Sequence, residues 1–158
     1  MTSLWLADAA ATDALGAALA RTRPTPAVVH LLGELGAGKS TLARALLRAL
    51  GVTGAIRSPT YTLVERYPLD EGGEAWHLDL YRIADAGELE YLGLDADDVV
   101  LWLIEWPERG SAALPRPDLV VALEVENDGR RARITAGTPE GQAWLTAMSA
   151  AAGFPGDS

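Results

Sequence analysis

The sequence predicts an α/β fold in which a mostly parallel central sheet is flanked by helices and extended by an antiparallel C-terminal hairpin. Two observations lead to this prediction. The apolar segment AVVHLL, residues 27–32, runs into a glycine-rich loop that is followed by a helical pattern. A second apolar run, VVLWLI at 99–104, lacks alternating polar residues, which is typical of a strand buried on both faces of a parallel sheet.

The chain has 158 residues, of which 49% are hydrophobic, enough for one core but not for two. We therefore expect a single domain over residues 1–152 and a disordered tail at 153–158. The apolar runs fall short of the roughly 20 residues of a membrane span, and the N-terminus lacks the basic start of a signal peptide. Together with the absence of cysteine, these features predict a cytoplasmic protein with no membrane association.

Along the chain, one helix is expected before the first strand and one after it. Residues 13–20 form the first, for which Thr12 is a suitable N-cap. Residues 40–50 place several leucines on one face, and Gly51 follows where a helix would end.

The segment RSPTYT, residues 57–62, allows two interpretations. Pro59 disfavours helical geometry at Ser58. The segment is either a proline turn that starts a strand at 61–67, or a loop whose hydroxyl groups meet a phosphate or its metal, as switch segments do.

Turn and capping signals place the remaining elements. DAGE at 85–88 resembles a capping box for a short helix that ends at Gly93. An Asn-Asp-Gly turn divides residues 119–136 into a hairpin. Thr138 caps a last helix with proline at its first position, and its core face consists of Trp144, Leu145 and Met148.

The glycine-rich loop has the spacing G-x-x-x-x-G-K-[ST], with Gly33, Gly38, Lys39 and Ser40 at the defining positions. In such a P-loop, backbone N–H groups cradle phosphates, and the hydroxyl coordinates Mg²⁺. Lys39 is the chain's single lysine among 13 basic residues, and a plain glycine turn gives no reason for it. The sequence therefore predicts a P-loop NTPase-like sheet that binds nucleotide through residues of this loop: Gly33, Glu34, Leu35, Gly36, Ala37, Gly38, Lys39, Ser40 and Thr41.

Two acids are candidates for the metal and the attacking water. Glu105 follows the buried strand 99–104, at the carboxyl end where α/β sheets place ligands, although it could be an ordinary surface acid. Asp79 lies in the strand-like segment AWHLDLYR, and an acid among apolar neighbours needs a partner. It could position water or Mg²⁺, or pair with Arg82. Trp106, next to Glu105, could pack in the core, shield the site or anchor a partner.

Several motifs together resemble the TsaE family, also called YjeE. GELGAGKST, SPTYTLVERY, HLDLYR, ELEYLG and IEWPERG occur in the family's order and spacing across residues 12–126. The resemblance implies a small P-loop ATPase, using ATP and Mg²⁺, that is required for threonylcarbamoyladenosine modification of tRNA. It also implies two partner proteins, TsaB and TsaD, of which TsaD transfers the threonylcarbamoyl group.

The resemblance assigns roles to single residues. Lys39, Asp79 and Glu105 correspond to residues expected to matter for ATP turnover, and Ser40 and Glu105 to the metal site. Thr12 is expected near the nucleotide, as an alternative to its capping role. Arg130 or Arg131 of the hairpin could approach the ribose or base, although solvation at the surface is the simpler role.

Charge and composition separate the remaining function classes. A formal net charge of -9 disfavours direct tRNA binding, because phosphate backbones repel an anionic surface. A small-molecule kinase is one alternative, but no arginine-dense lid segment is evident. A nucleotide-gated binding module with negligible hydrolysis is another. A GTPase switch is disfavoured, because its Asn-Lys-x-Asp motif needs a second lysine.

Overall fold

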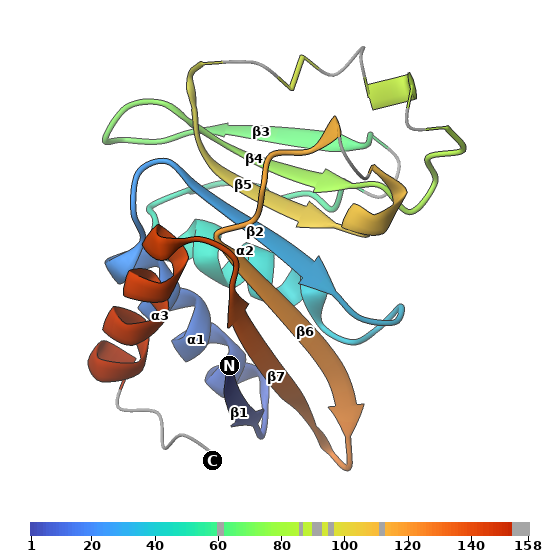
Figure 1. Ribbon diagram of the computed structural model, residues 1–158. Coiled ribbons are helices and arrows are strands. Elements are labelled where there is room, and N and C mark those ends of the chain that lie inside the picture. Colours follow the sequence, from blue (N-terminus) through green and yellow to red (C-terminus); the bar gives the residue numbers. More distant parts are fainter. Residues whose placement is uncertain (60–61, 86, 90–92, 95–96, 111–112, 153–158) are drawn as a thin grey trace.

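Figure 1 shows the computed structural model of the chain, which describes residues 1–59, 62–85, 87–89, 93–94, 97–110 and 113–152. Within these residues, seven strands form one sheet and three α-helices accompany it. The expected tail at 153–158 lies outside the described residues. None of the described helices is long and apolar enough to cross a membrane.

The middle of the sheet is parallel, as predicted. The spatial order of the strands is β1-β7-β6-β2-β5-β4-β3. The pairs β6–β2, β2–β5 and β5–β4 are parallel, and all outer pairs are antiparallel. The parallel strands are β2 (Ala27–Leu32), β4 (Glu74–Asp79), β5 (Val99–Glu105) and β6 (Leu119–Glu126).

Antiparallel strands extend the sheet at both edges. β7 (Gly129–Ala136) pairs with β6 in the predicted hairpin. β3 (Val64–Pro68) borders β4 at the opposite edge. β1 (Thr2–Leu6) pairs with β7 and has no counterpart among the elements expected from the sequence, because a five-residue strand at the chain start depends on a distant partner.

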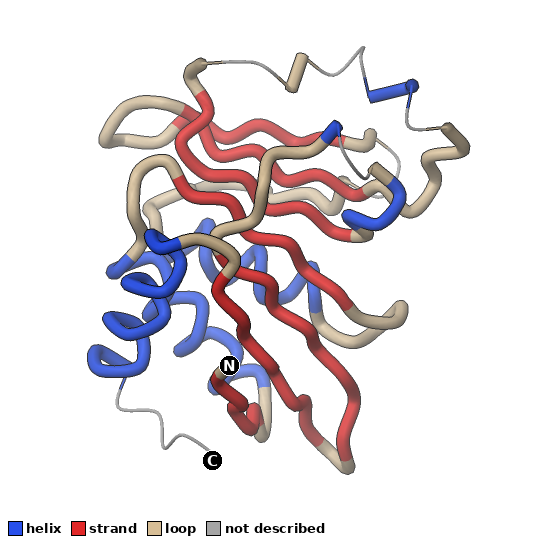
Figure 2. Tube along the Cα trace, viewed as in Figure 1, coloured by secondary structure: helices blue, strands red, loops and turns tan. Residues whose placement is uncertain are grey.

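The helices pack against one face of the sheet and share its larger hydrophobic cluster (Figures 1 and 2). They are α1 (Ala9–Thr22), α2 (Lys39–Ala49) and α3 (Pro139–Ala152). Thr138 caps α3 as predicted, accepting a hydrogen bond from Gly141 N at 2.9 Å. The buried Trp144 of α3 donates to the carbonyl of Leu19 in α1 at 3.2 Å.

Alternation along the central strands decides which side chains face the helices. On β5, Leu101 and Leu103 belong to the helix-side cluster, whereas Trp102 and Ile104 belong to a second cluster on the opposite face. Connecting segments cover that opposite face with residues such as Leu80 and Leu114. Because side chains alternate in direction along a strand, Glu105 lies on the helix side.

Two boundary predictions are wrong. α1 begins at Ala9, and its N-cap is Asp8, whose side chain accepts from Ala11 N at 3.0 Å. Thr12 therefore lies inside the helix and does not cap it. β3 starts at Val64, because a turn closed by the 2.9 Å bond from Leu63 N to Pro59 O precedes it. Residues 60–61 of the predicted strand lie outside the described part.

The expected short helix at 85–93 is described only in part. Asp85 accepts a hydrogen bond from Gly87 N at 2.9 Å, and Leu89 is buried in the second cluster. Residues 86 and 90–92 lie outside the described residues.

Gly16 provides a test of how closely α1 approaches α2. A Cβ atom on Gly16 would lie 2.6 Å from Ala45 Cβ and 2.8 Å from Leu46 N. Alanine improves helix propensity by about 1 kcal/mol, but overpacking costs roughly 1–3 kcal/mol. We expect Gly16→Ala to lower the free energy of unfolding, as measured by urea denaturation. The control Ala14→Gly, at an exposed position of α1, should cost only the propensity term of about 1 kcal/mol. A more stable Gly16→Ala variant would contradict the close packing.

Candidate functional site

The glycine-rich loop connects the end of β2 to the start of α2, in the middle of the sheet. Gly38 has a left-handed conformation, with φ of 106°, at the N-cap of α2, and no side chain caps that helix end. Gly33 has φ of 147°, and a Cβ atom there would lie 2.5 Å from Leu123 O. The loop therefore needs glycine at both positions. The N-terminus of α2 offers backbone N–H groups that lack intrahelical partners, a suitable environment for an anion.

Lys39 is the first residue of α2, and its side chain is folded back over the loop. It is 5% exposed, and its Nζ atom donates to the Gly33 carbonyl and lies 3.5 Å from Glu34 O. Burial lowers the pKa of Lys39 from its ordinary value, while the negative charges of Glu105 and Asp79 oppose that shift. A cation that has lost part of its hydration gains more from a nearby phosphate than one in water does.

Trp106 covers Lys39 from one side. Its backbone is left-handed, with φ of 57°, and its ring centroid lies 4.0 Å from Lys39 Nζ. The ring also packs against Tyr81, with centroids 4.9 Å apart. Trp106 also packs against the second hydrophobic cluster, so the structure supports both core packing and shielding of the site, and it does not test the role of a partner anchor.

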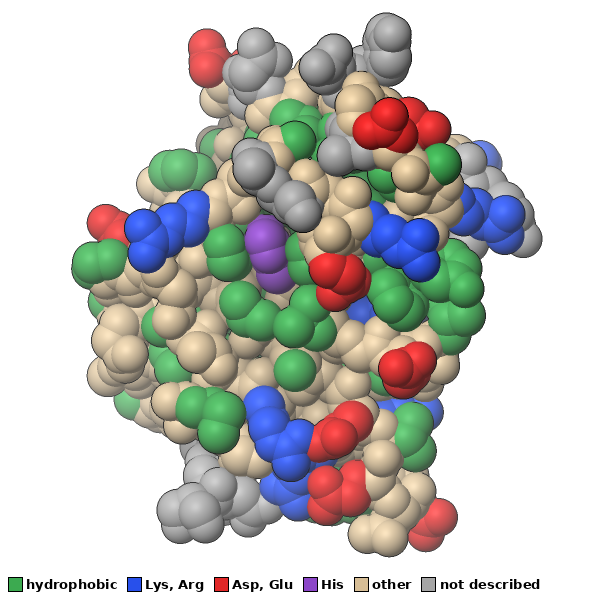
Figure 3. All heavy atoms as spheres, turned by 45° about the vertical axis from the view of Figure 1, so that its right-hand side comes forward, with side chains coloured by type: hydrophobic (Ala, Val, Ile, Leu, Met, Phe, Trp, Pro, Cys, Tyr) green, Lys and Arg blue, Asp and Glu red, His purple; other side chains and the backbone are tan. Residues whose placement is uncertain are grey.

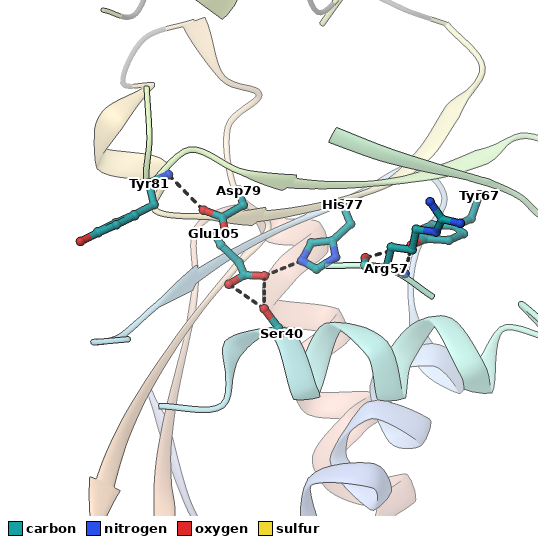
Figure 4. Close-up of polar contacts among 7 residues, drawn as sticks. All are labelled: Ser40, Arg57, Tyr67, His77, Asp79, Tyr81 and Glu105. Carbon is teal, nitrogen blue, oxygen red and sulfur yellow. Dashed lines mark hydrogen bonds and ion pairs between the residues drawn. The ribbon is translucent and has the colours of Figure 1, made fainter. Parts of the chain in front are cut away.

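The two candidate acids end adjacent strands. Asp79 of β4 and Glu105 of β5 are partners in the strand register, and both are buried, at 6% and 3% exposure. Ser40 of α2 donates to Glu105 through Oγ, with 2.9 Å to Oε2 and 3.2 Å to Oε1 (Figure 4). Asp79 accepts a hydrogen bond from Tyr81 N at 3.0 Å. Glu105 is therefore no surface acid, since its carboxylate lies over the first turn of α2.

These groups enclose a pocket of about 310 Å³. Its lining consists of Leu35, Gly36, Gly38, Lys39, Ser40, Thr41, Asp79, Tyr81, Glu105, Trp106 and Arg130. Three loop residues proposed for nucleotide binding are absent from that lining, namely Gly33, Glu34 and Ala37. Their carbonyl groups accept hydrogen bonds from Lys39 and Arg130.

A second hollow of about 290 Å³ adjoins the first, since both include Gly38, Thr41 and Arg130. Thr12 of α1 lines this second hollow. The two hollows together extend from the acids past the start of α2 to α1.

Arg130, at the start of β7, holds the outer side of the loop. Its Nε atom donates to Ala37 O at 3.1 Å, and Nη2 donates to Gly36 O at 3.3 Å. These bonds occupy the loop carbonyls on one side. The simpler expectation for Arg130, a solvated surface residue, does not hold, and no local pattern could reveal a contact that spans more than 90 residues. Arg131 instead pairs with Glu126, with Nη2 3.0 Å from Oε1.

The described part of the RSPTYT segment lies away from the pocket. The backbone N–H of Arg57 donates to the hydroxyl of Tyr67 at 3.1 Å, and that hydroxyl donates to the Arg57 carbonyl at 3.2 Å. In Figure 4, His77 lies between this pair and Ser40. None of the described residues of 57–62 lines the pocket. The phosphate-contacting alternative stays a prediction.

The oxygen atoms of this site suit a hard cation such as Mg²⁺, whose remaining ligands would be water and phosphate oxygens. Mg²⁺ usually takes one or two protein oxygens and completes its shell with water and phosphate. The described residues contain no group of three His, Cys, Asp or Glu that could hold a metal alone. The hydroxyl of Ser40 and the carboxylate of Glu105 fit the smaller donor set that accompanies a nucleotide.

Comparison with known proteins agrees with the resemblance to the TsaE family. The family model "Threonylcarbamoyl adenosine biosynthesis protein TsaE" matches residues 6–134, which include the loop, both acids and Arg130. The chain belongs to the TsaE family. Family members of this name take part in the biosynthesis of threonylcarbamoyladenosine in tRNA.

Individual TsaE proteins resemble the chain over most of its length. The protein from Haemophilus influenzae is 42% identical over 126 residues, covering 77% of this chain and 78% of its own. The protein from Streptomyces coelicolor is 37% identical and covers 84% and 93%. The crystal structure of Bacillus subtilis YdiB superposes with a TM-score of 0.78 at 25% identity, covering 94% of both chains.

Replacing Arg130 tests its hold on the loop. Arg130→Met keeps a long stem but removes both donors, each worth about 1 kcal/mol. We expect the Ala37 amide, which donates to Glu34 O at 3.1 Å, to exchange its hydrogen up to roughly 30-fold faster, the factor that corresponds to about 2 kcal/mol. Arg131→Met is the matched control and should leave this amide unchanged. Equal exchange in the wild type and Arg130→Met would show that the loop holds its shape without Arg130.

Proposed function

We propose that this protein binds and hydrolyses ATP with Mg²⁺ in support of threonylcarbamoyladenosine modification of tRNA. The observation that carries the proposal is the contact between Ser40 and Glu105 at the start of α2, beside Lys39 and the glycine loop. In this arrangement, a bound phosphate group, the Lys39 ammonium and a bound Mg²⁺ would all lie in the same pocket. Membership in the TsaE family supports the biological role.

The chain's own groups provide the binding chemistry. N–H groups of the loop and of the α2 N-terminus hold the β- and γ-phosphates, and Lys39 neutralises part of their charge. Ser40 and Glu105 hold Mg²⁺, which neutralises further charge on the same phosphates when bound. The second hollow, with Thr12 in its wall, receives the nucleoside end.

The two acids have different roles in this proposal, one toward the metal and one toward the attacking water. Glu105 is bonded to Ser40 and therefore belongs to the metal side of the site. Asp79 ends the neighbouring strand and points into the same pocket, so that it can orient the attacking water. Positioning and charge stabilisation account for most catalysis in phosphoryl transfer, and both acids are held by strands of the central sheet.

The partners that we propose are TsaB and TsaD, on the basis of the family resemblance. Leu35, at the tip of the loop, is 66% exposed, and an exposed apolar side chain beside a nucleotide pocket suits a partner that senses its occupancy. Direct tRNA binding is not part of the proposal. On the face in Figure 3, described basic side chains are interspersed with acidic ones, and the net charge is -9. The expected cytoplasmic location remains part of this proposal.

Substitution of Lys39 tests the proposal directly. At about 4 Å from a phosphate charge, an ammonium contributes about 4 kcal/mol at an effective dielectric constant near 20. We expect Lys39→Ala to abolish Mg·ATP binding in calorimetry and phosphate release. Lys39→Arg keeps the charge, but a planar guanidinium does not fit the narrow loop, and we expect it to fail as well. Near-normal ATP turnover by Lys39→Ala would refute the assignment.

A second experiment separates hydrolysis from the two alternative functions. The protein is incubated with labelled ATP and a metabolite panel, with and without TsaB and TsaD. Free phosphate as the sole product supports the ATPase, whereas a phosphorylated metabolite supports a kinase. Full tRNA modification with a non-hydrolysable ATP analogue would instead make the protein a nucleotide-gated binding module.

A further inference from the structure

His77 is a buried polar residue that the proposed function leaves without a role. It is 2% exposed and lies on β4, two residues before Asp79. Residues two apart on a strand share a face, so His77 and Asp79 both project toward the helices. The Nε2 atom of His77 lies 2.5 Å from Glu105 Oε2, a contact drawn in Figure 4.

The remaining contacts of His77 identify which nitrogen donates. Among the described residues, its Nδ1 atom is buried and has no hydrogen-bond partner. A hydrogen on Nδ1 would be a buried unsatisfied donor, and the Nε2 lone pair would then face a carboxylate lone pair. The tautomer that fits these contacts carries its hydrogen on Nε2 and donates it to Glu105.

Two donors from different elements therefore hold one carboxylate. Ser40 of α2 and His77 of β4 both contact Oε2 of Glu105. The terminal torsion of a glutamate side chain is broad, so that a single donor leaves its plane poorly fixed. A second donor from the adjacent strand fixes the plane of the carboxylate over the first turn of α2.

We propose that His77 is a positioning residue that orients Glu105 for Mg²⁺. This inference rests on the proposed function, in which Glu105 and Ser40 hold the metal of Mg·ATP. Groups that bond a metal-binding side chain commonly change metal affinity by about 10-fold to 100-fold when they are replaced. His77 touches neither nucleotide nor metal in this arrangement, and its effect passes through Glu105.

Three variants separate positioning from packing. His77→Leu keeps an apolar side chain of moderate size and loses the donor. His77→Gln retains an N–H donor at the end of a side chain of comparable reach. His30→Leu is the matched control, since His30 is the chain's other histidine, and its Nε2 contacts Pro115 O at 3.2 Å and not Glu105.

The measurement is the affinity for a non-hydrolysable ATP analogue by calorimetry, with EDTA and across a Mg²⁺ titration, together with thermal unfolding. We expect His77→Leu to keep the EDTA affinity within about twofold and to need at least about tenfold more Mg²⁺ for half-maximal enhancement. His77→Gln should restore the Mg²⁺ requirement to within about threefold of wild type, and His30→Leu should leave it unchanged.

The outcomes distinguish this inference from the proposed function. A wild-type Mg²⁺ requirement in His77→Leu would overturn the role of His77 while leaving the proposed function intact. Equal losses in both His77 variants, or a loss of affinity in EDTA as well, would assign His77 to packing and also overturn it. Wild-type protein that binds the analogue with no help from Mg²⁺ would overturn the proposed metal site, and the inference with it.

Discussion

The burial of opposite charges where β2 and β5 end is the constraint on which the site depends. Lys39 and Glu105 are 5% and 3% exposed, and buried charges are costly unless they are paired and hydrogen-bonded. The structure meets this cost locally. Lys39 donates to the carbonyl of Gly33 and packs against Trp106, while Glu105 accepts from Ser40 and His77. Removing one member leaves its partners buried with unmet hydrogen bonds.

The two faces of the sheet are covered differently, and this difference decides where the charged residues lie. The described helices cover one face of the sheet, and connecting segments cover the other. Alternation along β4 and β5 therefore directs Asp79 and Glu105 toward α2, while Leu78 and Ile104 join the opposite cluster. The close approach of α1 to α2 at Gly16 stabilises the helix that carries Lys39 and Ser40. The packing of α1 against α2 thus helps to hold the element on which two of the site residues lie.

Support for the loop comes from parts of the chain that are remote in sequence. Arg130 of the C-terminal hairpin bonds the carbonyls of Gly36 and Ala37, and Leu123 O leaves no room for a side chain at Gly33. The hairpin is thus part of the site's framework. Because Arg130 joins the two, movement of the hairpin would be transmitted to the glycine-rich loop.

Local chemistry in the sequence was sufficient to predict the parallel strands, the loop, the last helix and the hairpin, because each has an apolar run, a glycine motif, a cap or a turn signal of its own. The same reasoning failed for β1, whose strand depends on pairing with β7, and for the start of α1, where Asp8 and Thr12 are both chemically suitable caps. Local sequence patterns could not predict which side chains would contact one another. That Glu105 would bond Ser40 and His77, and that Arg130 would hold the loop, was decided by strand register and helix placement, which bring together residues 28 to 94 positions apart. Sequence determined which chemical groups were available, and tertiary structure decided which of them meet.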